Sequence, residues 1–129
     1  MRLHLSMDLP RITDAEWEVM KVVWRQAPCS AHDVVAALAS SKTWSVGTIK
    51  TLLNRLHSKG ALRFEKVGKS YLYHPAVAAD RLRNAEAESF LDRIFDGALS
   101  PMIKHLARAR KLSEQDLNEL EQILKKGRK

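Results

Sequence analysis

The sequence predicts a mainly α-helical fold with one small β-hairpin. Apolar residues recur at helical spacing through most of the chain between Thr13 and Leu124. Several of these segments open with Ser or Thr followed three residues later by Glu or Asp, a pattern typical of helix N-termini. Between Leu62 and Pro75, apolar and polar residues alternate on both sides of a Gly-Lys-Ser turn, as in a hairpin.

The 129 residues divide into three predicted parts. We expect residues 1–10 to form a flexible N-terminal arm, residues 11–75 a compact domain, and residues 76–129 a helical appendage. A single cysteine, Cys29, excludes an internal disulfide and favours a reducing cytoplasm. No apolar run approaches the ~18 residues of a membrane span, and the N-terminus is too short and too polar for a signal peptide. We therefore expect no direct membrane insertion.

Two capped helices open the compact domain. Thr13 and Glu16 are spaced as a capping box, in which each side chain bonds an otherwise unpaired backbone N–H, and Pro28 ends this first helix. Ser30 and Asp33 repeat the device for the second helix. The two apolar stripes are Val19, Met20, Val22 and Val23 in the first helix and Ala31, Val34, Val35 and Leu38 in the second. Each stripe predicts a buried helix face.

The third helix, Ser45–Lys59, has two unlike faces. Ser45 is its predicted cap, and it stops at Gly60, where a left-handed backbone costs little. The apolar face comprises Ile49, Leu52, Leu53 and Leu56. At about 100° per residue, the opposite face comprises Gly47, Thr51, Asn54 and Ser58, flanked by Thr48, Lys50 and Arg55. This polar face carries no acidic residue and is small and hydrogen-bonding at its centre, unlike an ordinary solvated face.

Positive charge is concentrated around this helix. The net charge of the chain is +7, and between Lys42 and Lys69 seven Lys and Arg residues stand against one acid, Glu65. A basic cluster of this kind indicates a nucleic-acid interface. The alternative is a basic surface that only improves solubility.

Three helices followed by a basic hairpin form a winged helix-turn-helix, a DNA-binding fold. Its third helix enters the major groove of double-stranded DNA, which favours short side chains, hydrogen-bonding groups and no carboxylate near the phosphates. The candidate base contacts are Thr48, Thr51 and Asn54. Lys50 and Arg55 would reach either a guanine or a phosphate, or remain solvated charges. Lys66 and Lys69 of the hairpin are expected on backbone phosphates, the alternative being protection of a sheet edge.

The region after Pro75 is predicted to hold two copies of the chain together. Helices are expected at Val77–Phe95, from Pro101 onward, and after a third capping pair, Ser113 and Asp116. These helices are too small to enclose a core of their own, so their apolar faces favour an isologous homodimer. The expected dimerisation residues are Phe90, Leu91, Ile94, Phe95, Ile103, Leu106, Leu117, Leu120, Ile123 and Leu124. The alternative is that the helices fold back on the compact domain.

No catalytic or metal-binding pattern is recognisable in the sequence. The five histidines show no metal-ligand spacing, and no phosphate loop, nucleophile elbow or pair of carboxylates stands out. We therefore expect no enzyme, no metal and no cofactor. Cys29 stands near a helix N-terminus, which can lower a thiol pKa, but a small semi-buried residue is favoured over a redox sensor. Trp44 is expected to anchor the core rather than to stack on a base.

The order of these motifs resembles the penicillinase-repressor family, whose members repress beta-lactamase, methicillin-resistance and copper-transport genes. The family's first helix is similar to ITDAEWEVMKVVW, its recognition helix to WSVGTIKTLLNRLHSKGAL, and the exit of its wing to YLYHP. Its dimerisation region is similar to FLDRIFDGALSPMI and LSEQDLNELEQIL, so the likeness covers about residues 11–125. The resemblance implies a homodimeric repressor that binds an inverted-repeat operator upstream of regulated genes.

The resemblance also implies roles for individual residues. Family contacts to bases and phosphates fall at positions matching Gly47, Thr48, Lys50, Thr51 and Arg55. Gly47 stands where some relatives have lysine. Relatives that control beta-lactamase are cleaved in the dimerisation helix after signalling by a membrane metalloprotease sensor, and the matching bond here is Ser89–Phe90, with serine in place of their asparagine. The cysteine-rich metal motif of copper-responsive relatives has no counterpart in the terminal LKKGRK.

Two other functions compete with that of a repressor. One is a protein-interaction module that docks a sensor or partner protein and has only non-specific affinity for nucleic acid. The other is an RNA-binding winged helix. The small polar centre of the third helix suits a DNA groove better than either, and the sequence indicates no exposed aromatic platform on which bases would stack.

Overall fold

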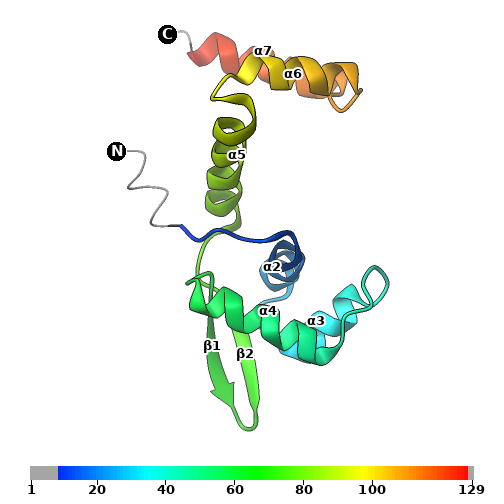
Figure 1. Cartoon of the computed structure of the whole chain (residues 1–129), viewed down its shortest axis with the longest axis vertical. Coiled ribbons are helices and arrows are strands. Elements are labelled where there is room, and N and C mark those ends of the chain that lie inside the picture. The colour runs from blue at the N-terminus through cyan, green and yellow to red at the C-terminus, as the bar shows by residue number, and fades with distance from the viewer. Residues whose placement is uncertain (1–8, 128–129) are drawn as a thin grey trace. The chain divides into compact units, whose positions relative to one another are not determined.

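The computed structural model describes residues 9–127, which form a series of helices with one β-hairpin (Figure 1). The elements are α2 (Asp14–Gln26), α3 (Ala31–Leu38), α4 (Val46–Ser58), β1 (Leu62–Val67), β2 (Ser70–Pro75), α5 (Ala79–Phe95), α6 (Leu99–Arg108) and α7 (Glu114–Gly127). The chain divides into two compact units, one up to Glu86 and one from Ala87 onward. Of the expected N-terminal arm, residues 1–8 lie outside the described residues.

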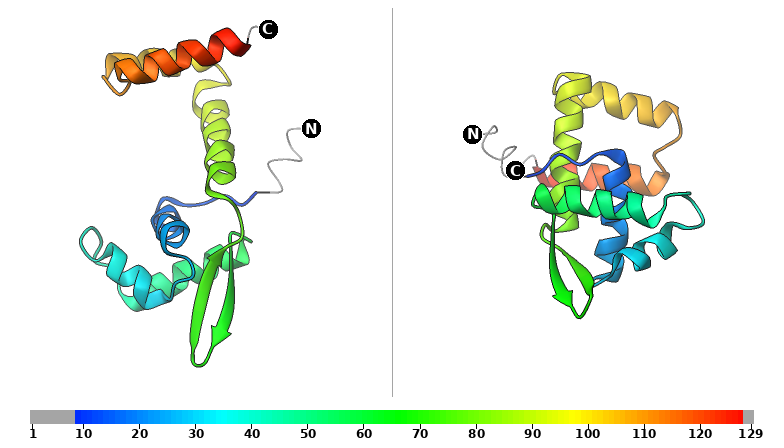
Figure 2. Two further views of the ribbon diagram at one scale, coloured as in Figure 1. Left: turned by 180° about the vertical axis from the view of Figure 1, so that it is seen from behind. Right: turned by 60° about the horizontal axis from the view of Figure 1, so that its bottom comes forward.

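The first unit is built from α2, α3, α4 and the hairpin. α4 packs against both α2 and α3, and the hairpin contacts α2 and α4 (Figure 2). Both predicted capping boxes are present: Thr13 and Glu16 exchange side-chain to backbone hydrogen bonds at the start of α2, and Ser30 and Asp33 do so at the start of α3. Local sequence signals therefore determine where these helices begin.

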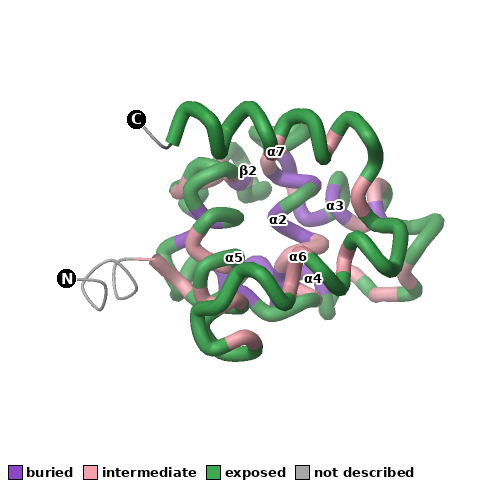
Figure 3. Tube along the Cα trace, turned by 90° about the horizontal axis from the view of Figure 1, so that it is seen from above, coloured by how far each residue is buried: buried purple, intermediate pink, exposed green. Residues whose placement is uncertain are grey.

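The core of the first unit consists of the apolar stripes that the sequence predicts, and Figure 3 shows the buried segments of this unit in purple. The stripes of α2, α3 and α4 meet here. The fully buried members include Val19, Met20, Val34, Leu53 and Leu56. Trp44 packs against this core, as expected for an anchor, and the Lys42 ammonium lies 5.4 Å from the centre of its ring.

The hairpin is tied to the connection between α2 and α3. β1 and β2 pair antiparallel, with Phe64 opposite Tyr73, and Gly68 in the turn has a φ of 64°, a left-handed conformation that costs glycine little. Tyr73 N–H donates to the Cys29 carbonyl at 2.7 Å, and Cys29 N–H donates to the Tyr73 carbonyl at 3.2 Å. This two-bond bridge fixes β2 beside the residues that follow α2.

The start of α5 belongs to the first unit. Leu82 is fully buried in its core, and Trp24 Nε1 donates to the Val77 carbonyl at 3.0 Å. The sequence predicts this helix from Val77, whereas in the structure it begins at Ala79. The Val77 carbonyl thus lies just outside the helix, where it accepts the indole N–H.

The second unit contains the end of α5, then α6 and α7. α5 ends at Phe95, close to the predicted break at Gly97, and both Asp96 and Gly97 have a left-handed backbone, with φ values of 52° and 81°. At the start of α7, Ser113 N–H donates to the Asp116 carboxylate, and Asp116 N–H donates to Ser113 Oγ, each at 3.0 Å. Between residues 87 and 127 no residue is buried. Within residues 9–127, no helix is both long enough and apolar enough to span a membrane.

Candidate nucleic-acid interface

α4 separates the two faces that the sequence predicts for it. Its apolar stripe is buried, and its members are Ile49, Leu52, Leu53 and Leu56. The candidate DNA-contact residues of the helix are all exposed, and these are Gly47, Thr48, Lys50, Thr51, Asn54 and Arg55. The structure therefore brings the candidates of this helix together on one accessible surface.

Hydrogen bonds within α4 orient its hydroxyl groups. The cap residue Ser45 accepts the Thr48 backbone N–H at 3.1 Å, and its own hydroxyl lies 3.2 Å from Thr48 Oγ1. Thr51 Oγ1 donates to the Gly47 carbonyl at 3.0 Å. Because the Thr51 proton is committed within the helix, this side chain offers an oxygen lone pair and a methyl group. Those groups suit an amino group or a thymine methyl on a base edge.

Gly47 leaves the first turn of α4 without a side chain. A Cβ atom placed there would meet only Ser45 Oγ, at 3.6 Å, which is ordinary van der Waals contact. Packing inside this chain therefore does not require glycine at this position. A bare backbone here does permit close approach of a ligand to the helix.

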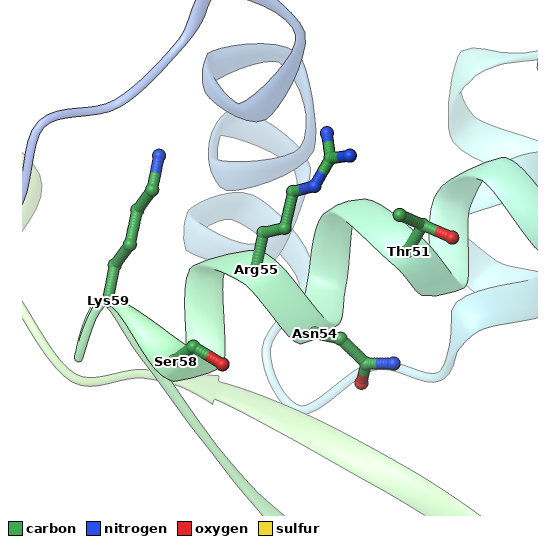
Figure 4. Close-up of a pocket in the computed structure, with 5 residues that line it drawn as sticks. All are labelled: Thr51, Asn54, Arg55, Ser58 and Lys59. Carbon is green, nitrogen blue, oxygen red and sulfur yellow. The ribbon is translucent and has the colours of Figure 1, made fainter.

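A shallow open groove runs along α4 beside the candidate residues. Figure 4 shows the side chains that line it, with Arg55 and Lys59 extending on the same side of the helix and Asn54 on the opposite side. The lining residues are Thr51, Asn54, Arg55, Ser58 and Lys59. The groove thus combines hydrogen-bonding groups with cationic side chains and has no acidic residue in its lining.

The charge of Lys59 is already matched by a buried acid. Lys59 Nζ donates to Glu16 Oε1, and Glu16 is only 1% exposed. The sequence assigns Glu16 only to the capping box of α2, so this pair is a feature that sequence reasoning missed. The two residues lie far apart in the chain, and no local pattern joins them.

The hairpin presents its two lysines without acidic partners. Lys66 and Lys69 are exposed, and neither forms a salt bridge with any residue that the structure describes. Glu65 instead lies 3.1 Å from the His74 ring nitrogen, on the opposite face of the hairpin from Lys66 because successive residues of a strand alternate faces. Both lysines are therefore free to meet phosphates.

An aromatic cluster lies between α4 and the hairpin, and the sequence analysis missed it. The Phe64 ring lies 4.6 Å from the His57 ring, 5.0 Å from the Tyr71 ring and 6.0 Å from the Tyr73 ring, measured between centroids. Tyr73 is buried, whereas Phe64 and Tyr71 are 42% and 45% exposed. The expectation that no exposed aromatic platform exists is therefore wrong. The sequence pattern that could have predicted this cluster is the alternation of the hairpin, which places Phe64, Tyr71 and Tyr73 on one face.

Cys29 is a core residue. It is 1% exposed. Burial, with a smaller contribution from the Asp33 charge, raises the pKa of its thiol. The lowered pKa considered from its place near a helix N-terminus is thus not supported, because burial disfavours the charged thiolate. A raised pKa keeps the thiol protonated and poorly reactive.

The predicted dimerisation residues form exposed or half-buried apolar surfaces on the second unit. None of them is buried in the single chain. The most accessible are Phe90, Ile94, Leu117, Ile123 and Leu124, and the half-buried ones are Leu91, Phe95, Ile103, Leu106 and Leu120. Within residues 9–127, no other part of the chain fully covers these apolar faces.

The bond that the resemblance implies for cleavage, Ser89–Phe90, lies inside α5. Arg93 Nε donates to Ser89 Oγ at 3.2 Å, one turn further along the helix, and the Phe90 side chain is exposed. A protease would therefore have to unwind part of α5 to reach this bond in extended form.

No group of three or more His, Cys, Asp or Glu residues within residues 9–127 could hold a metal ion.

Comparison with known proteins relates this interface to one family of regulators. A family model described as penicillinase repressor matches residues 12–126. The chain is 39% identical over 116 residues to the penicillinase repressor of Bacillus licheniformis, and the alignment covers 90% of this chain and 91% of that protein. It is 30% identical over 115 residues to the methicillin resistance regulatory protein MecI of Staphylococcus aureus strain N315, covering 89% of this chain and 94% of that protein.

Among solved structures, the chain is similar to a solution structure of the DNA-binding domain of the repressor BlaI. The superposition has a TM-score of 0.52 at 41% sequence identity, and it covers 57% of this chain and 89% of that domain. The matched share agrees in size with a single DNA-binding unit rather than with the whole chain.

Proposed function

The chain belongs to the penicillinase repressor family, and on that premise we propose that it is a dimeric transcriptional repressor that binds an inverted-repeat operator through α4 in the major groove. The family resemblance and the winged-helix fold expected from the sequence are both confirmed. Repression follows when an operator-bound dimer excludes the transcription machinery from the genes downstream.

The observation that carries this proposal is the exposed face of α4. Its centre has short hydrogen-bonding side chains, its flanks have Lys50 and Arg55, and it has no carboxylate. Short side chains allow a helix to approach base edges closely in the major groove, and positive charge on its flanks attracts the phosphates on either side. The buried opposite face fixes this helix on the rest of the unit.

We assign different contacts to different parts of this surface. Thr48, Thr51 and Asn54 are proposed to contact base edges, and the bare backbone at Gly47 allows the first turn to approach the groove closely. Lys50 and Arg55 contact either a guanine or a phosphate. Lys66 and Lys69 are proposed on the phosphates that flank the groove. Among the residues that the structure describes, no acid pairs with these four cations.

The second unit is proposed to form the homodimer. Its exposed apolar side chains include Ile123 and Leu124, and burial of such a side chain contributes roughly 1.5–3 kcal/mol relative to leaving it in water. A two-fold symmetric contact buries the same faces on both copies. It also places two α4 helices on the two halves of an inverted repeat, about one or two helical turns apart.

The proposal extends to the place of action and to an upstream partner. A repressor that binds chromosomal operators acts in the bacterial cytoplasm. The family resemblance supplies a membrane metalloprotease sensor system as partner, and Ser89–Phe90 as the bond cut during derepression. The exposure of Phe90 supports access to this bond once α5 is locally unwound. An uncut chain after induction of such a system would exclude this route.

Fluorescence anisotropy with two labelled duplexes tests the proposed function. One duplex carries the sequence upstream of the chain's own gene, and the other carries the same bases in scrambled order, each over a salt series. We expect tight binding to the first and many-fold weaker binding to the second. A log–log salt slope near −5 would correspond to about six neutralised phosphates.

Equal and weak binding to both duplexes would contradict sequence-specific repression. The basic face would then be a generic surface, and the chain would act as a protein-interaction module that docks a sensor or another protein. A preference for single-stranded RNA over both duplexes would instead favour the RNA-binding alternative, in which Phe64 and Tyr71 serve as a stacking surface.

A further inference from the structure

The C-terminal end of α4 is held by an ion pair to which the proposed function assigns no role. Lys59, the C-cap residue of α4, donates from Nζ to Glu16 Oε1 and, at 2.8 Å, to the Arg11 carbonyl. Glu16 lies in the first turn of α2, 43 residues earlier in the chain. The Glu16–Lys59 pair therefore joins the last turn of α4 to the N-terminus of α2.

Glu16 is the buried member of this pair. It is 1% exposed, against 32% for the Lys59 side chain, and Oε1 also accepts the Thr13 backbone N–H at 2.9 Å. Burial on its own would raise the pKa of Glu16. The hydrogen bonds from Lys59 and Thr13, together with the charge of Lys59, outweigh this effect of burial, so the pKa of Glu16 is lowered. The carboxylate is therefore ionised at neutral pH and needs a cation beside it.

The pair lies beside the surface proposed to meet DNA. Arg55 and Ser58 line the same groove as Lys59, and Arg55 extends on the same side of the helix (Figure 4). Leu56 and Ala61, on either side of this turn, are fully buried in the core, whereas the residues between them are exposed. The Lys59 backbone N–H also donates to the Arg55 carbonyl at 3.0 Å. A displaced Lys59 would consequently shift the backbone that carries Arg55 and Ser58.

We propose that the Glu16–Lys59 pair positions the last turn of α4 for operator binding, and that Lys59 is a positioning residue rather than a phosphate contact. This inference rests on the proposed function of α4. Transfer of the Lys59 ammonium to a phosphate would leave a buried carboxylate without its counter-charge, which proteins strongly disfavour. The contribution of Lys59 to binding therefore passes through Glu16 and not through the nucleic acid.

A double-mutant cycle with a salt series tests this inference. The variants are Lys59→Met, Glu16→Gln and the two combined, each titrated with the labelled upstream and scrambled duplexes. Urea unfolding of each variant identifies conditions in which it is folded. Lys21→Met is the matched control, because Lys21 pairs with Glu18 at 3.3 Å on the exposed surface of α2. Lys50→Met represents a lysine proposed to contact DNA.

We expect each single variant to lose about tenfold in affinity for the upstream duplex. The double variant should lose no more affinity than the single variant that binds less tightly, since coupled residues do not act additively. Their salt slope stays that of the wild type, because no phosphate contact is lost. Lys59→Arg keeps the ion pair and restores most of the affinity. Lys21→Met leaves affinity unchanged. If Lys59→Met alone fails to fold, Glu16→Gln and the double variant still decide the result.

Two results would overturn the inference. A salt slope that falls by about 0.9 in Lys59→Met, with normal binding by Glu16→Gln, would make Lys59 a phosphate contact. Lower urea midpoints with unchanged affinity of the folded variants would reduce the pair to a stabilising contact. A wild-type chain that binds both duplexes equally is a distinct outcome, since it rejects the proposed function itself and the inference with it.

Discussion

The two units of this chain bury their apolar residues to very different extents. Every buried hydrophobic residue that the structure describes lies at or before Leu82, whereas no residue from 87 to 127 is buried. Both units nevertheless contain helices with well-formed caps and apolar stripes. Regular secondary structure is thus shared by the two units, and within residues 9–127 a closed core is found only in the first.

This difference teaches that an apolar stripe indicates a burial requirement without saying which surface satisfies it. The stripe of α4 is covered within the same chain by α2 and α3. The stripe of α7, with Leu117, Leu120 and Leu124, is exposed or half-buried in the single chain. Units of about 40 residues rarely enclose a stable core alone, and for this reason we propose that a second copy of the chain covers the second unit.

The largest expected effect comes from breaking the second unit. Leu120→Glu combined with Leu124→Glu places charges in the apolar stripe of α7, and we expect a monomer in analytical sedimentation. Operator affinity should fall about 100-fold or more, because the second half-site is no longer bound in an intramolecular step.

The matched control for this double variant is Gln115→Glu with Gln122→Glu. It adds the same charges to the opposite face of α7 and should stay dimeric. A Leu120→Glu/Leu124→Glu chain that remains a dimer would show that these leucines lie outside the dimer contact.

The next effect compares the same substitution in the two units. Leu53→Ala empties a fully buried site and should cost about 2–5 kcal/mol of unfolding free energy. Leu117→Ala, made in the monomeric Leu120→Glu/Leu124→Glu chain, should change the unfolding free energy by less than about 0.5 kcal/mol. Urea titrations measure both values. Similar losses at the two sites would mean that the second unit has a core within one chain.

A smaller effect is expected on the DNA-contact surface of the first unit. If Arg55 contacts a guanine, Arg55→Ala should cost about 1–3 kcal/mol of operator binding and relax the preference at that base pair. Anisotropy with single-base variants of the duplex measures this loss. An equal loss on scrambled DNA would reassign Arg55 to a phosphate, and Arg25→Ala, which removes the same charge from α2, controls for net charge.

The smallest effect has opposite signs for stability and binding. Gly47→Ala should raise the unfolding free energy by about 0.5–1 kcal/mol, because alanine is the better helix residue and its Cβ meets only Ser45 Oγ. The same methyl group should weaken operator binding, since it stands where the backbone is proposed to approach the groove. Stabilisation without any loss of affinity would show that this approach is not close.

The fold was predictable from the sequence where the determining contacts are local. The three capping pairs at Thr13, Ser30 and Ser113 and the cap at Ser45 lie within three residues of their partners, and the structure contains each of them. The apolar stripe of α4 was likewise set by the helical repeat alone. The separation of its polar face from the core then followed directly.

Contacts between distant residues were not predictable in this way. The sequence gives no reason to join Glu16 to Lys59, because either residue has an ordinary local role as a cap or a solvated charge. The aromatic cluster depends on the hairpin register that sets Phe64 opposite Tyr73. Likewise, nothing in the periodicity of α5 separates Leu82, buried in the first unit, from Phe90, exposed in the second. The assignment of individual residues to bases or phosphates stays a prediction.

The placement of the tryptophans has a practical consequence. All three, Trp17, Trp24 and Trp44, lie before residue 87, and the Trp17 and Trp24 rings are 5.7 Å apart. Intrinsic fluorescence excited at the indole band therefore reports on the first unit only, while far-ultraviolet circular dichroism reports on the helices of both. Recorded together during a denaturant titration, the two signals distinguish unfolding of the first unit from loss of helix elsewhere in the chain, without any attached dye.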